Sequence, residues 1–385
     1  MKNPSKVPGE ITIRPLRIIL GGLILFLAAN MVFALINPSI ASLNLVNKVL
    51  PGFERFPAPR ITLEKNGITD VTGEFVANLD VLFSSHIISV QEKPKDEYRI
   101  ILVGDSTVWG SRLTADQTLT TQMNQAKLKS CDGRRIVVYN LGYPGVSAIK
   151  DLMILSQAVN HYQPDMVIWS FTLSTLVPER IRDIGFSVAN HDRLLEIERK
   201  TGYPFGADKN VPAPLSFLDR TIYGRRQELN YLLRLAMFDL KSQSIGTDYL
   251  KVQEEGELGQ GFSGQDDRFF EFTPRDDLAN LLDFNFLRAG IKIAGDIPVI
   301  FINEPILIDE TNPVRYNQVY PRWAFDQYRD SLTRLSTENA WTYIDMWDLL
   351  PKEEFTDTDF HRTFTGETKV MQELVPVIQA ESCKK

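Results

Sequence analysis

The fold is decided by residues 99–111, which read RIILVGDSTVWGS. An apolar run from Ile100 to Val103 stops at Gly104 and is followed at once by Asp105 and Ser106. Apolar, β-branched residues that give way to glycine and small polar residues are typical of a buried strand in an α/β sheet. Because chemistry in such sheets gathers at the carboxyl ends of the strands, Ser106 is a candidate nucleophile. The same tripeptide also occurs in ordinary strand-to-loop turns.

Composition limits the classes of function. The chain has 385 residues, 43% hydrophobic and 24% charged, which are ordinary values for a globular protein long enough for one large α/β domain. A net charge of −7 argues against a nucleic-acid partner. Two cysteines, Cys131 and Cys383, fit neither a disulfide framework nor a zinc site, although they could pair with each other. Any histidine base must be one of four, namely His86, His161, His191 and His361.

The N-terminus carries a candidate membrane anchor. Residues 18–36 form an apolar run whose only polar side chain is Asn30, about the length that crosses a bilayer core. The four basic residues before it outnumber the single acid, so the positive-inside rule predicts a cytoplasmic segment 1–17, a single span 18–36 and an extracytoplasmic remainder. The competing interpretation is a cleaved signal peptide, whose apolar region is usually shorter.

The rest of the chain alternates strand and helix patterns. Residues 37–97 read as a juxtamembrane segment that packs on the domain 98–385. Five apolar runs predict strands, and the strand–helix alternation predicts right-handed crossovers and a parallel, doubly wound sheet. The predicted strands are 98–103, 135–141, 165–171, 298–303 and 341–346, and the predicted helices are 114–128, 147–161, 226–240, 276–294, 320–339 and one in the tail that begins near Thr363 or Thr365.

Residues 178–290 interrupt this alternation after the third strand. The segment is acidic and is broken by glycines and prolines, and its stretch 254–267 reads as a loop rich in glycine and acids. A structureless connection of this length is improbable in a compact domain. We therefore expect an inserted lid or cap beside the active site.

A nucleophilic serine needs a base, an acid that orients the base, and donors for the oxyanion. His361 precedes the last helix, and Asp357 and Asp359 lie beside it as candidate orienting carboxylates. Backbone N–H groups at Ser106 and Gly142 are candidate oxyanion donors, since glycine lets a substrate approach the main chain. Glu304, which follows the fourth strand, either contacts substrate or caps a turn.

At these positions the chain resembles the SGNH, or GDSL-like, hydrolase family. The resemblance rests on Gly104-Asp105-Ser106, Gly142 and an Asp-rich run that closes on His361, and it covers roughly residues 98–380 less the insertion. It implies Ser106 as nucleophile, His361 as base and an aspartate three residues before the histidine as its orienting group. It also implies a flavodoxin-like three-layer α/β/α sandwich that needs no metal or organic cofactor.

Two positions depart from the family pattern. Where the family has an oxyanion-donating asparagine after the third strand, this chain has Ser174, a donor of shorter reach. The residue three before His361 is Thr358 rather than aspartate. A bulge would fit Asp357, whereas the alternation of an extended strand would place Asp359 on the face of the histidine, so both are retained.

The expected function is a membrane-anchored, extracytoplasmic serine acyl-ester hydrolase or O-acyltransferase that acts through an acyl-Ser106 intermediate. Similarly anchored members of the family add or remove O-acetyl groups on cell-envelope polysaccharides, so the resemblance implies an acylated small-molecule or polysaccharide substrate. A transferase would receive its acyl group from an integral-membrane partner. The alternative is a non-catalytic envelope protein that keeps the fold and binds a glycan or a partner protein.

Overall fold

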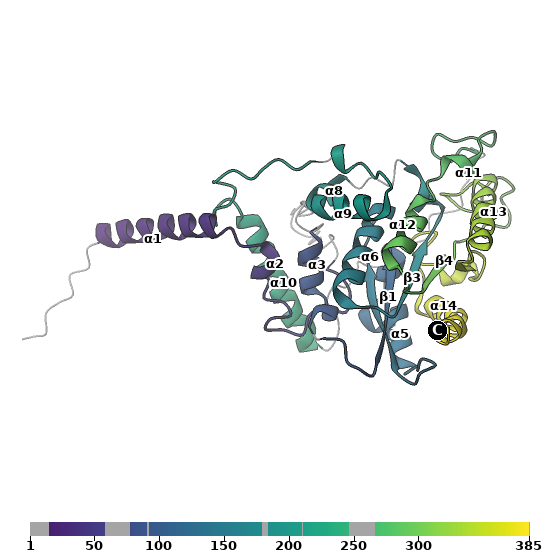
Figure 1. Ribbon diagram of the computed structural model, residues 1–385, viewed down its shortest axis with the longest axis horizontal. Coiled ribbons are helices and arrows are strands. Elements are labelled where there is room, and N and C mark those ends of the chain that lie inside the picture. The colour runs from purple at the N-terminus through teal and green to yellow at the C-terminus, as the bar shows by residue number, and fades with distance from the viewer. Residues whose placement is uncertain are drawn as a thin grey trace, which may run out of the picture. The chain divides into compact units, whose positions relative to one another are not determined.

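The computed structural model describes residues 15–57, 78–90, 92–178, 184–209, 211–245 and 266–384. The chain divides into two compact units. Figure 1 labels the helices and strands of both. The first comprises Met1–Leu43 and Ala213–Leu233, and the second comprises Asn44–Pro212 and Arg234–Lys385. The five-stranded sheet and the candidate site both belong to the second unit.

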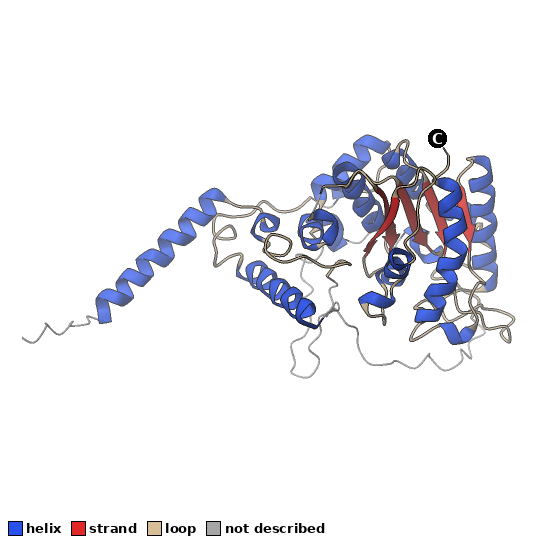
Figure 2. Ribbon diagram, turned by 90° about the horizontal axis from the view of Figure 1, so that it is seen from below, coloured by secondary structure: helices blue, strands red, loops and turns tan. Residues whose placement is uncertain are grey.

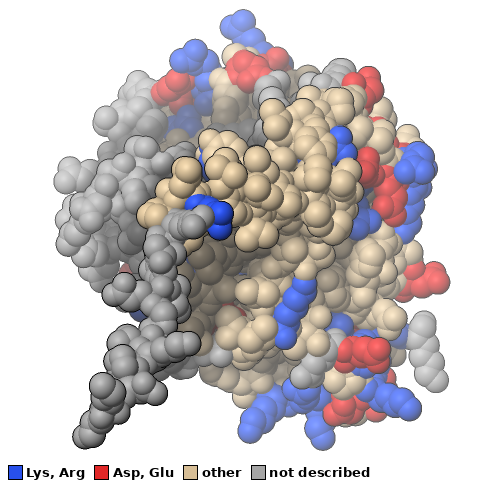
Figure 3. Space-filling view, turned by 90° about the vertical axis from the view of Figure 1, so that its left-hand side faces the viewer, with Lys and Arg blue, Asp and Glu red and all other residues tan. Residues whose placement is uncertain are grey.

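The first unit begins with helix α1 (Pro15–Ile36), followed by the short α2 (Ile40–Leu43). The most apolar 18-residue stretch of α1 has a mean hydropathy of 2.5, and only 11% of that stretch is buried. The helix is therefore long and apolar enough to span a membrane. Figure 3 views the molecule from the side on which α1 begins, so that this helix is seen end-on. The helix includes the predicted span 18–36 and starts three residues earlier.

The sheet of the second unit is entirely parallel, with strand order β2-β1-β3-β4-β5. This is the order of the flavodoxin-like doubly wound fold, so the predicted fold class is confirmed. Each strand lies within two residues of its predicted bounds. The strands are β1 (Glu97–Gly104), β2 (Arg135–Gly142), β3 (Met166–Phe171), β4 (Val299–Asn303) and β5 (Thr342–Asp345).

Helices cover both faces of the sheet (Figure 2). On one face, apolar side chains of β1, β3 and β4 pack with those of α5 (Leu119–Gln125) and α14 (Phe364–Glu381). On the other face, α6 (Ala148–Tyr162) and α12 (Asn285–Ala294) pack together over Trp169 of β3. Gly290 permits this contact, because a Cβ there would lie 2.4 Å from the Trp169 ring.

Two predicted helices are shorter than expected. Instead of one helix over 114–128, a 3₁₀ turn precedes α5, because Thr118 caps α5 by accepting a hydrogen bond from the Thr121 N–H. Instead of one helix over 276–294, Leu282 adopts extended backbone and separates α11 (Leu278–Leu281) from α12. The remaining helical elements are α3 (Leu79–Ser85), η2 (Ile87–Ser89), α4 (Ser106–Trp109), η3 (Ala115–Gln117), η4 (Leu173–Leu176), α8 (Ile184–Ala189), α9 (His191–Thr201), η5 (Ala207–Lys209), α10 (Arg226–Ile245), α13 (Arg322–Glu338) and η6 (Lys352–Glu354).

Residues 44–57 and 78–90, which the sequence analysis assigns to a segment before the sheet, belong to the same unit as the sheet. Residues 44–57 and 78–90 are joined by backbone hydrogen bonds from Phe53 N–H to the Ser85 carbonyl and from Ile87 N–H to the Phe53 carbonyl. Arg55, 1% exposed, donates to the carbonyls of Trp109, Gly110 and Leu113, directly after the turn that carries Ser106. This segment therefore braces the candidate nucleophile turn.

The insertion 178–290, which the sequence predicts to be a lid or cap, is divided between the two units. Helices α8 and α9 contact α6, and α9 also contacts α12, so this part thickens one layer of the sandwich. Residues 213–233 group with α1 in the other unit. The predicted loop 254–267 lies almost wholly outside the described residues.

A disulfide joins Cys131, in the loop before β2, to Cys383, just after α14. Their Cα atoms are 5.0 Å apart and their sequence separation is 252 residues, so the bond closes a very long loop. Long loops lose the most conformational entropy in the unfolded chain when they are closed. The pairing that the sequence left open is therefore present in the structure.

Breaking this disulfide is expected to lower the free energy of unfolding by about 2–4 kcal/mol. The measurement is urea denaturation of the detergent-solubilised full chain, followed by tryptophan fluorescence. Cys131→Ser, Cys383→Ser and reduction of the unaltered chain should give the same shift. A midpoint that does not move on reduction would contradict this expectation.

Candidate active site

The candidate nucleophile lies on a tight turn at the carboxyl end of β1. The Asp105 carboxylate accepts a hydrogen bond from the Thr107 N–H at 2.9 Å and so caps the one-turn helix α4. Gly110 ends α4 in the left-handed region, at a φ of 85°. Ser106 is therefore the first residue of a short helix held rigidly at both ends.

Two glycines let this turn sit directly on the sheet. Gly104 and Gly142 are opposite each other in the β1–β2 register. A Cβ on Gly104 would lie 2.6 Å from the Val108 side chain, and one on Gly142 would lie 2.5 Å from the Trp109 nitrogen. Larger residues at either position would push the Ser106 turn away from the strands.

His361 lies within hydrogen-bond distance of both Ser106 and Asp357. Its Nε2 atom is 3.0 Å from the Ser106 Oγ atom, and its Nδ1 atom is 2.8 Å from the Asp357 Oδ1 atom. The His361 and Asp357 side chains are each 15% exposed, so they are sheltered but not sealed from solvent. Ser106, His361 and Asp357 thus have the geometry of a nucleophile, a base and an orienting acid.

A tight loop brings Asp357 rather than Asp359 to the histidine. Phe355 and Arg362 form an antiparallel bridge, and the Thr356 N–H donates to the His361 carbonyl at 2.8 Å. The chain between them turns back on itself, so a carboxylate four residues before His361 faces the imidazole. The bulged arrangement considered for Asp357 is the one observed.

The electrostatic surroundings keep Asp357 ionised. Burial alone would raise its pKa, but hydrogen bonds and charge from His361 and Arg112 outweigh burial and lower the pKa well below its usual value. Arg112 donates from Nε to the Asp357 Oδ2 atom at 2.8 Å. An ionised carboxylate at this position favours the imidazolium that forms when His361 takes a proton.

Asp359, the second candidate for the acid that orients His361, bonds to other groups instead. The prediction that retained it is therefore corrected. Its carboxylate accepts from the Gln318 N–H at 3.0 Å, and its backbone carbonyl accepts from the Leu307 N–H at 2.8 Å. Asp359 therefore fixes the loop that precedes α13 and makes no described contact with His361.

Two of the three candidate oxyanion donors are already engaged. The Gly142 N–H donates to the Asn140 side chain at 3.1 Å, so Gly142 serves packing rather than anion binding. Ser174 is 3% exposed, and its Oγ atom accepts from the Tyr320 hydroxyl at 3.0 Å. The Ser174 N–H also donates to that hydroxyl, so Ser174 belongs to a buried network under the loop before α13.

The third candidate donor, the Ser106 N–H, has no protein acceptor among the described residues. The Gly145 N–H, which is not among the predicted donors, also has no protein acceptor among the described residues. Gly145 is exposed and has a φ of 105°, three residues beyond the Gly104–Gly142 pair at the same edge of the sheet. The Pro144-Gly145 dipeptide is the signal that could have found it, since such pairs mark turns that need a positive φ.

A buried cluster of charged side chains contacts Thr107 and Arg362, the residues that follow Ser106 and His361. Glu304, 1% exposed, accepts from the Thr107 hydroxyl and lies 3.7 Å from Arg362, which in turn donates to Glu367 at 3.1 Å. Burial and the nearby Asp105 carboxylate raise the pKa of Glu304 to about 8. Glu304 therefore connects the residue after Ser106 with the residue after His361.

Lys150 adds a second buried support that the sequence did not reveal. It is fully buried on α6, and its ammonium donates to the carbonyls of Gly104 and Tyr143 and pairs with Asp151 at 2.9 Å. It thus ties the end of β1 to the loop after β2. A lysine inside a helix gives no sequence signal for this role, because lysines there usually face solvent.

The other histidines do not approach Ser106 in the described structure. His86 is fully buried, and burial lowers its pKa to about 4. Its Nε2 atom lies 3.0 Å from the Asn140 carbonyl, and its Nδ1 atom accepts from the Ile88 N–H, so it is a structural side chain. His191 contacts the Ala207 carbonyl beside α9. Within the described ranges, no cluster of three metal-ligating side chains occurs.

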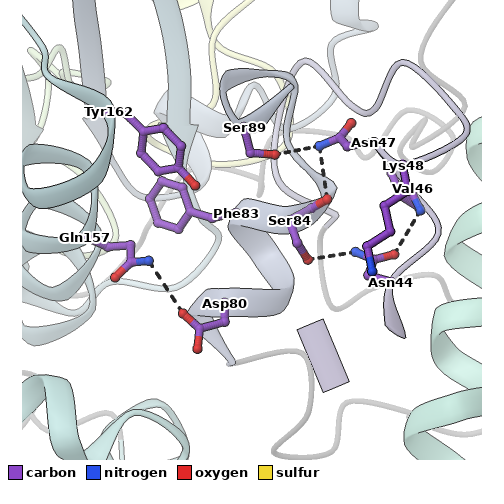
Figure 4. A pocket seen from close by; sticks show the side chains of 10 residues that line it. All are labelled: Asn44, Val46, Asn47, Lys48, Asp80, Phe83, Ser84, Ser89, Gln157 and Tyr162. Carbon is purple, nitrogen blue, oxygen red and sulfur yellow. Dashed lines mark hydrogen bonds between the residues drawn. The ribbon is translucent and has the colours of Figure 1, made fainter. Parts of the chain in front are cut away.

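A surface pocket of about 320 Å³ lies away from these residues (Figure 4). It is lined by residues of the juxtamembrane segment and of α6, and contains none of the candidate catalytic side chains. Its amides bond to protein neighbours. Asn44 donates to Ser84, and Asn47 donates to Ser89 and to the Ser84 carbonyl.

Comparison with known proteins gives only distant structural likeness. No protein-family profile matches the chain, and no curated protein does. A carbohydrate acetylesterase family member from Sinorhizobium meliloti is 11% identical, covering 73% of this chain and 97% of its own, with a TM-score of 0.33. A member of the lipolytic G-D-S-L family from Veillonella parvula is 10% identical, covering 72% and 97%, with a TM-score of 0.36. The aryl esterase of M. smegmatis is 12% identical, covering 73% and 98%, with a TM-score of 0.35.

Proposed function

We propose that this protein is a serine acyl-ester hydrolase or O-acyltransferase of SGNH type that acts through an acyl-Ser106 intermediate. The observation that carries the proposal is the relay from Ser106 Oγ to His361 Nε2, at 3.0 Å, and from His361 Nδ1 to Asp357, at 2.8 Å. The order of these residues along the chain and the flavodoxin-like strand order support the same assignment.

In the proposed reaction, His361 Nε2 takes the Ser106 hydroxyl proton as Oγ attacks the acyl carbonyl. The backbone N–H groups of Ser106 and Gly145 stabilise the oxyanion of the tetrahedral intermediate. The imidazolium, held by ionised Asp357, then gives its proton to the departing alkoxide, and the acyl group remains on Ser106. A water or a sugar hydroxyl, deprotonated by His361, attacks this ester and releases Ser106.

The proposal places the enzyme at a membrane, with α1 as an uncleaved anchor and the catalytic domain on the extracytoplasmic side. Basic residues precede α1, which supports a cytoplasmic N-terminus. The Cys131–Cys383 disulfide supports an oxidising compartment for the domain, since disulfides are rare in the cytosol.

The proposed substrates are O-acylated small molecules or polysaccharides of the cell envelope. Hydrolysis and transfer share the acyl-enzyme and differ only in the acceptor that resolves it. A transferase would take its acyl group from an integral-membrane partner. The alternative, a non-catalytic binding protein, requires no relay of this geometry, so the relay favours catalysis.

The test is labelling of the detergent-solubilised full chain with a fluorophosphonate, which reacts with activated serines. We expect labelling at Ser106 in the unaltered chain and none in Ser106→Ala. His361→Ala should also prevent labelling, because the hydroxyl then lacks its base. If the folded, unaltered chain is not labelled, the non-catalytic alternative takes the place of this proposal.

A further inference from the structure

Residues 213–233 expose an unusual number of large apolar side chains. They belong to the same compact unit as α1. Five of these side chains are exposed by about half or more, namely Leu215 (53%), Phe217 (47%), Leu218 (73%), Tyr223 (63%) and Leu233 (57%). A concentration of this kind on a folded segment usually marks an interaction surface.

Asn30 joins this segment to α1. It is the only polar side chain in the apolar span, and it is 7% exposed on a helix whose other residues are mostly exposed. Its Oδ1 atom accepts from the Tyr223 N–H at 2.9 Å, and its amide donates to the Phe26 carbonyl at 2.8 Å. An amide in a membrane-spanning helix requires such partners, because an unsatisfied polar group in hydrocarbon is costly.

A second contact fixes the same segment beyond the end of α1. The Arg225 guanidinium donates to the Pro38 carbonyl at 2.7 Å and pairs with Glu228 at 2.9 Å. The chain therefore leaves this unit after residue 43 and returns to it at residue 213. Tyr223 and Arg225 of the returning segment then donate hydrogen bonds to Asn30 and to the Pro38 carbonyl.

The position of Asn30 gives the depth of the contact. Asn30 lies six residues before the end of α1 at Ile36, which is about 9 Å along the helix axis at 1.5 Å per residue. If α1 spans the bilayer, Tyr223 lies near the boundary between acyl chains and headgroups, where tyrosine is enriched.

The exposed Arg226 stacks on the Tyr223 ring at 4.6 Å, and Arg220 is nearby in sequence. Apolar side chains beside arginines are typical of segments that lie in the interface plane.

We propose that residues 213–233 form an interfacial membrane segment that lies in the outer leaflet against α1. The partner that covers its exposed apolar side chains is the lipid bilayer. The apolar side chains contact acyl chains, and the arginines contact lipid phosphates. This inference rests on the proposed membrane anchor. It would tether the catalytic domain to the bilayer by the insertion as well as by the N-terminus, which suits an enzyme whose substrate is close to the membrane surface.

The experiment uses the full chain in vesicles of phosphatidylcholine and phosphatidylglycerol, with a fluorophore on a single introduced cysteine. The native disulfide is kept, and lipids that carry a quencher on the acyl chain are added. Leu218→Cys probes the interfacial segment, Leu25→Cys probes α1, and Leu281→Cys is the matched control, an exposed leucine on α11 of the other unit. We expect blue-shifted, quenched emission at positions 25 and 218 and no quenching at 281.

Each outcome decides the proposal. Quenching at 25 without quenching at 218 would overturn the interfacial segment and leave the anchor intact. Quenching at neither position would overturn both, and equal quenching at 281 would mean non-specific adhesion and overturn the segment. Adding Asn30→Leu to the Leu218→Cys chain should weaken quenching at 218, since the hydrogen bond to the Tyr223 N–H is lost, whereas quenching at 25 should persist.

Discussion

Replacing Ser106 with alanine is expected to lower kcat/KM for a small activated acetyl ester by about 10⁴-fold or more. The reason is that the variant has no hydroxyl to form the acyl-enzyme, while the fold around α4 needs no change to accommodate a smaller side chain. The measurement is steady-state hydrolysis by the detergent-solubilised full chain, with thermal unfolding as the check on folding. A Ser106→Ala variant that stays as active as the unaltered chain would refute the acyl-Ser106 mechanism.

The two aspartates beside His361 provide a matched comparison within the same experiment. Asp357→Asn removes the charge that holds and stabilises the imidazolium, and losses of about 10³–10⁴-fold in kcat are typical of that change. Asp359→Asn alters a carboxylate of similar sequence position that bonds to the Gln318 N–H instead. We expect its kcat to change by less than about tenfold. If Asp359→Asn had the larger effect, the assignment of the orienting acid would be reversed.

The fold could be predicted from the sequence because each buried strand is a continuous apolar run that ends in glycine or polar residues. Ile100, Val138, Ile168 and Ile300, one from each of four strands, are all buried. Helix lengths were harder, because Thr118 and Leu282 end or divide helical patterns through local caps and backbone angles. The insertion was hardest, since its parts serve two different units, and hydrophobic periodicity does not say which neighbour a face will meet.

The candidate site was partly predictable for a similar reason. Ser106 and His361 could be predicted because one follows the first strand and the other precedes the last helix. Their order along the chain was enough to place both at the same edge of the sheet. The choice between Asp357 and Asp359 depends on the turn closed by Phe355 and Arg362, a three-dimensional contact. Gly142 was chosen for its missing side chain, but its N–H is used by Asn140, and no sequence pattern reports that a donor is already occupied.

The buried cluster beneath the site leads to the largest expected effect on stability. Arg362, 3% exposed, is the cation nearest to Glu304 and Glu367, which are each 1% exposed. Removing one partner of a buried ion pair leaves an uncompensated charge, which typically costs about 3–5 kcal/mol. Arg362→Met is therefore expected to lower the free energy of unfolding by that amount, as measured by urea denaturation in detergent.

Two further variants separate this effect from a loss of packing. Adding Glu367→Gln to Arg362→Met removes the carboxylate that the first substitution leaves without its cation, and it should recover part of the loss, as a double-mutant cycle would show. Arg193→Met, which breaks the half-exposed pair with Glu196 on α9, should change the free energy of unfolding by less than about 1 kcal/mol. If Arg362→Met were as mild as Arg193→Met, the cluster would not be stabilising the turns that carry Ser106 and His361.

The same cluster predicts the sign of a pH dependence. The pKa of Glu304 is raised in the folded protein to about 8, so the folded state holds this proton more tightly than the unfolded chain does. A group with a raised pKa contributes stability at pH values below its unfolded pKa, and that stability is lost as the pH rises through the folded pKa. The unaltered chain should therefore lose stability between about pH 5 and pH 9, and Glu304→Gln, which is neutral throughout, should lose less.

Because Glu304 accepts from the Thr107 hydroxyl beside Ser106, its ionisation above pH 8 places a second negative charge next to the buried Asp105 carboxylate. This repulsion acts on the turn that carries Ser106. In the unaltered chain, the free energy of unfolding and the rate of ester hydrolysis should therefore fall with the same pH dependence. In Glu304→Gln the two should no longer change together.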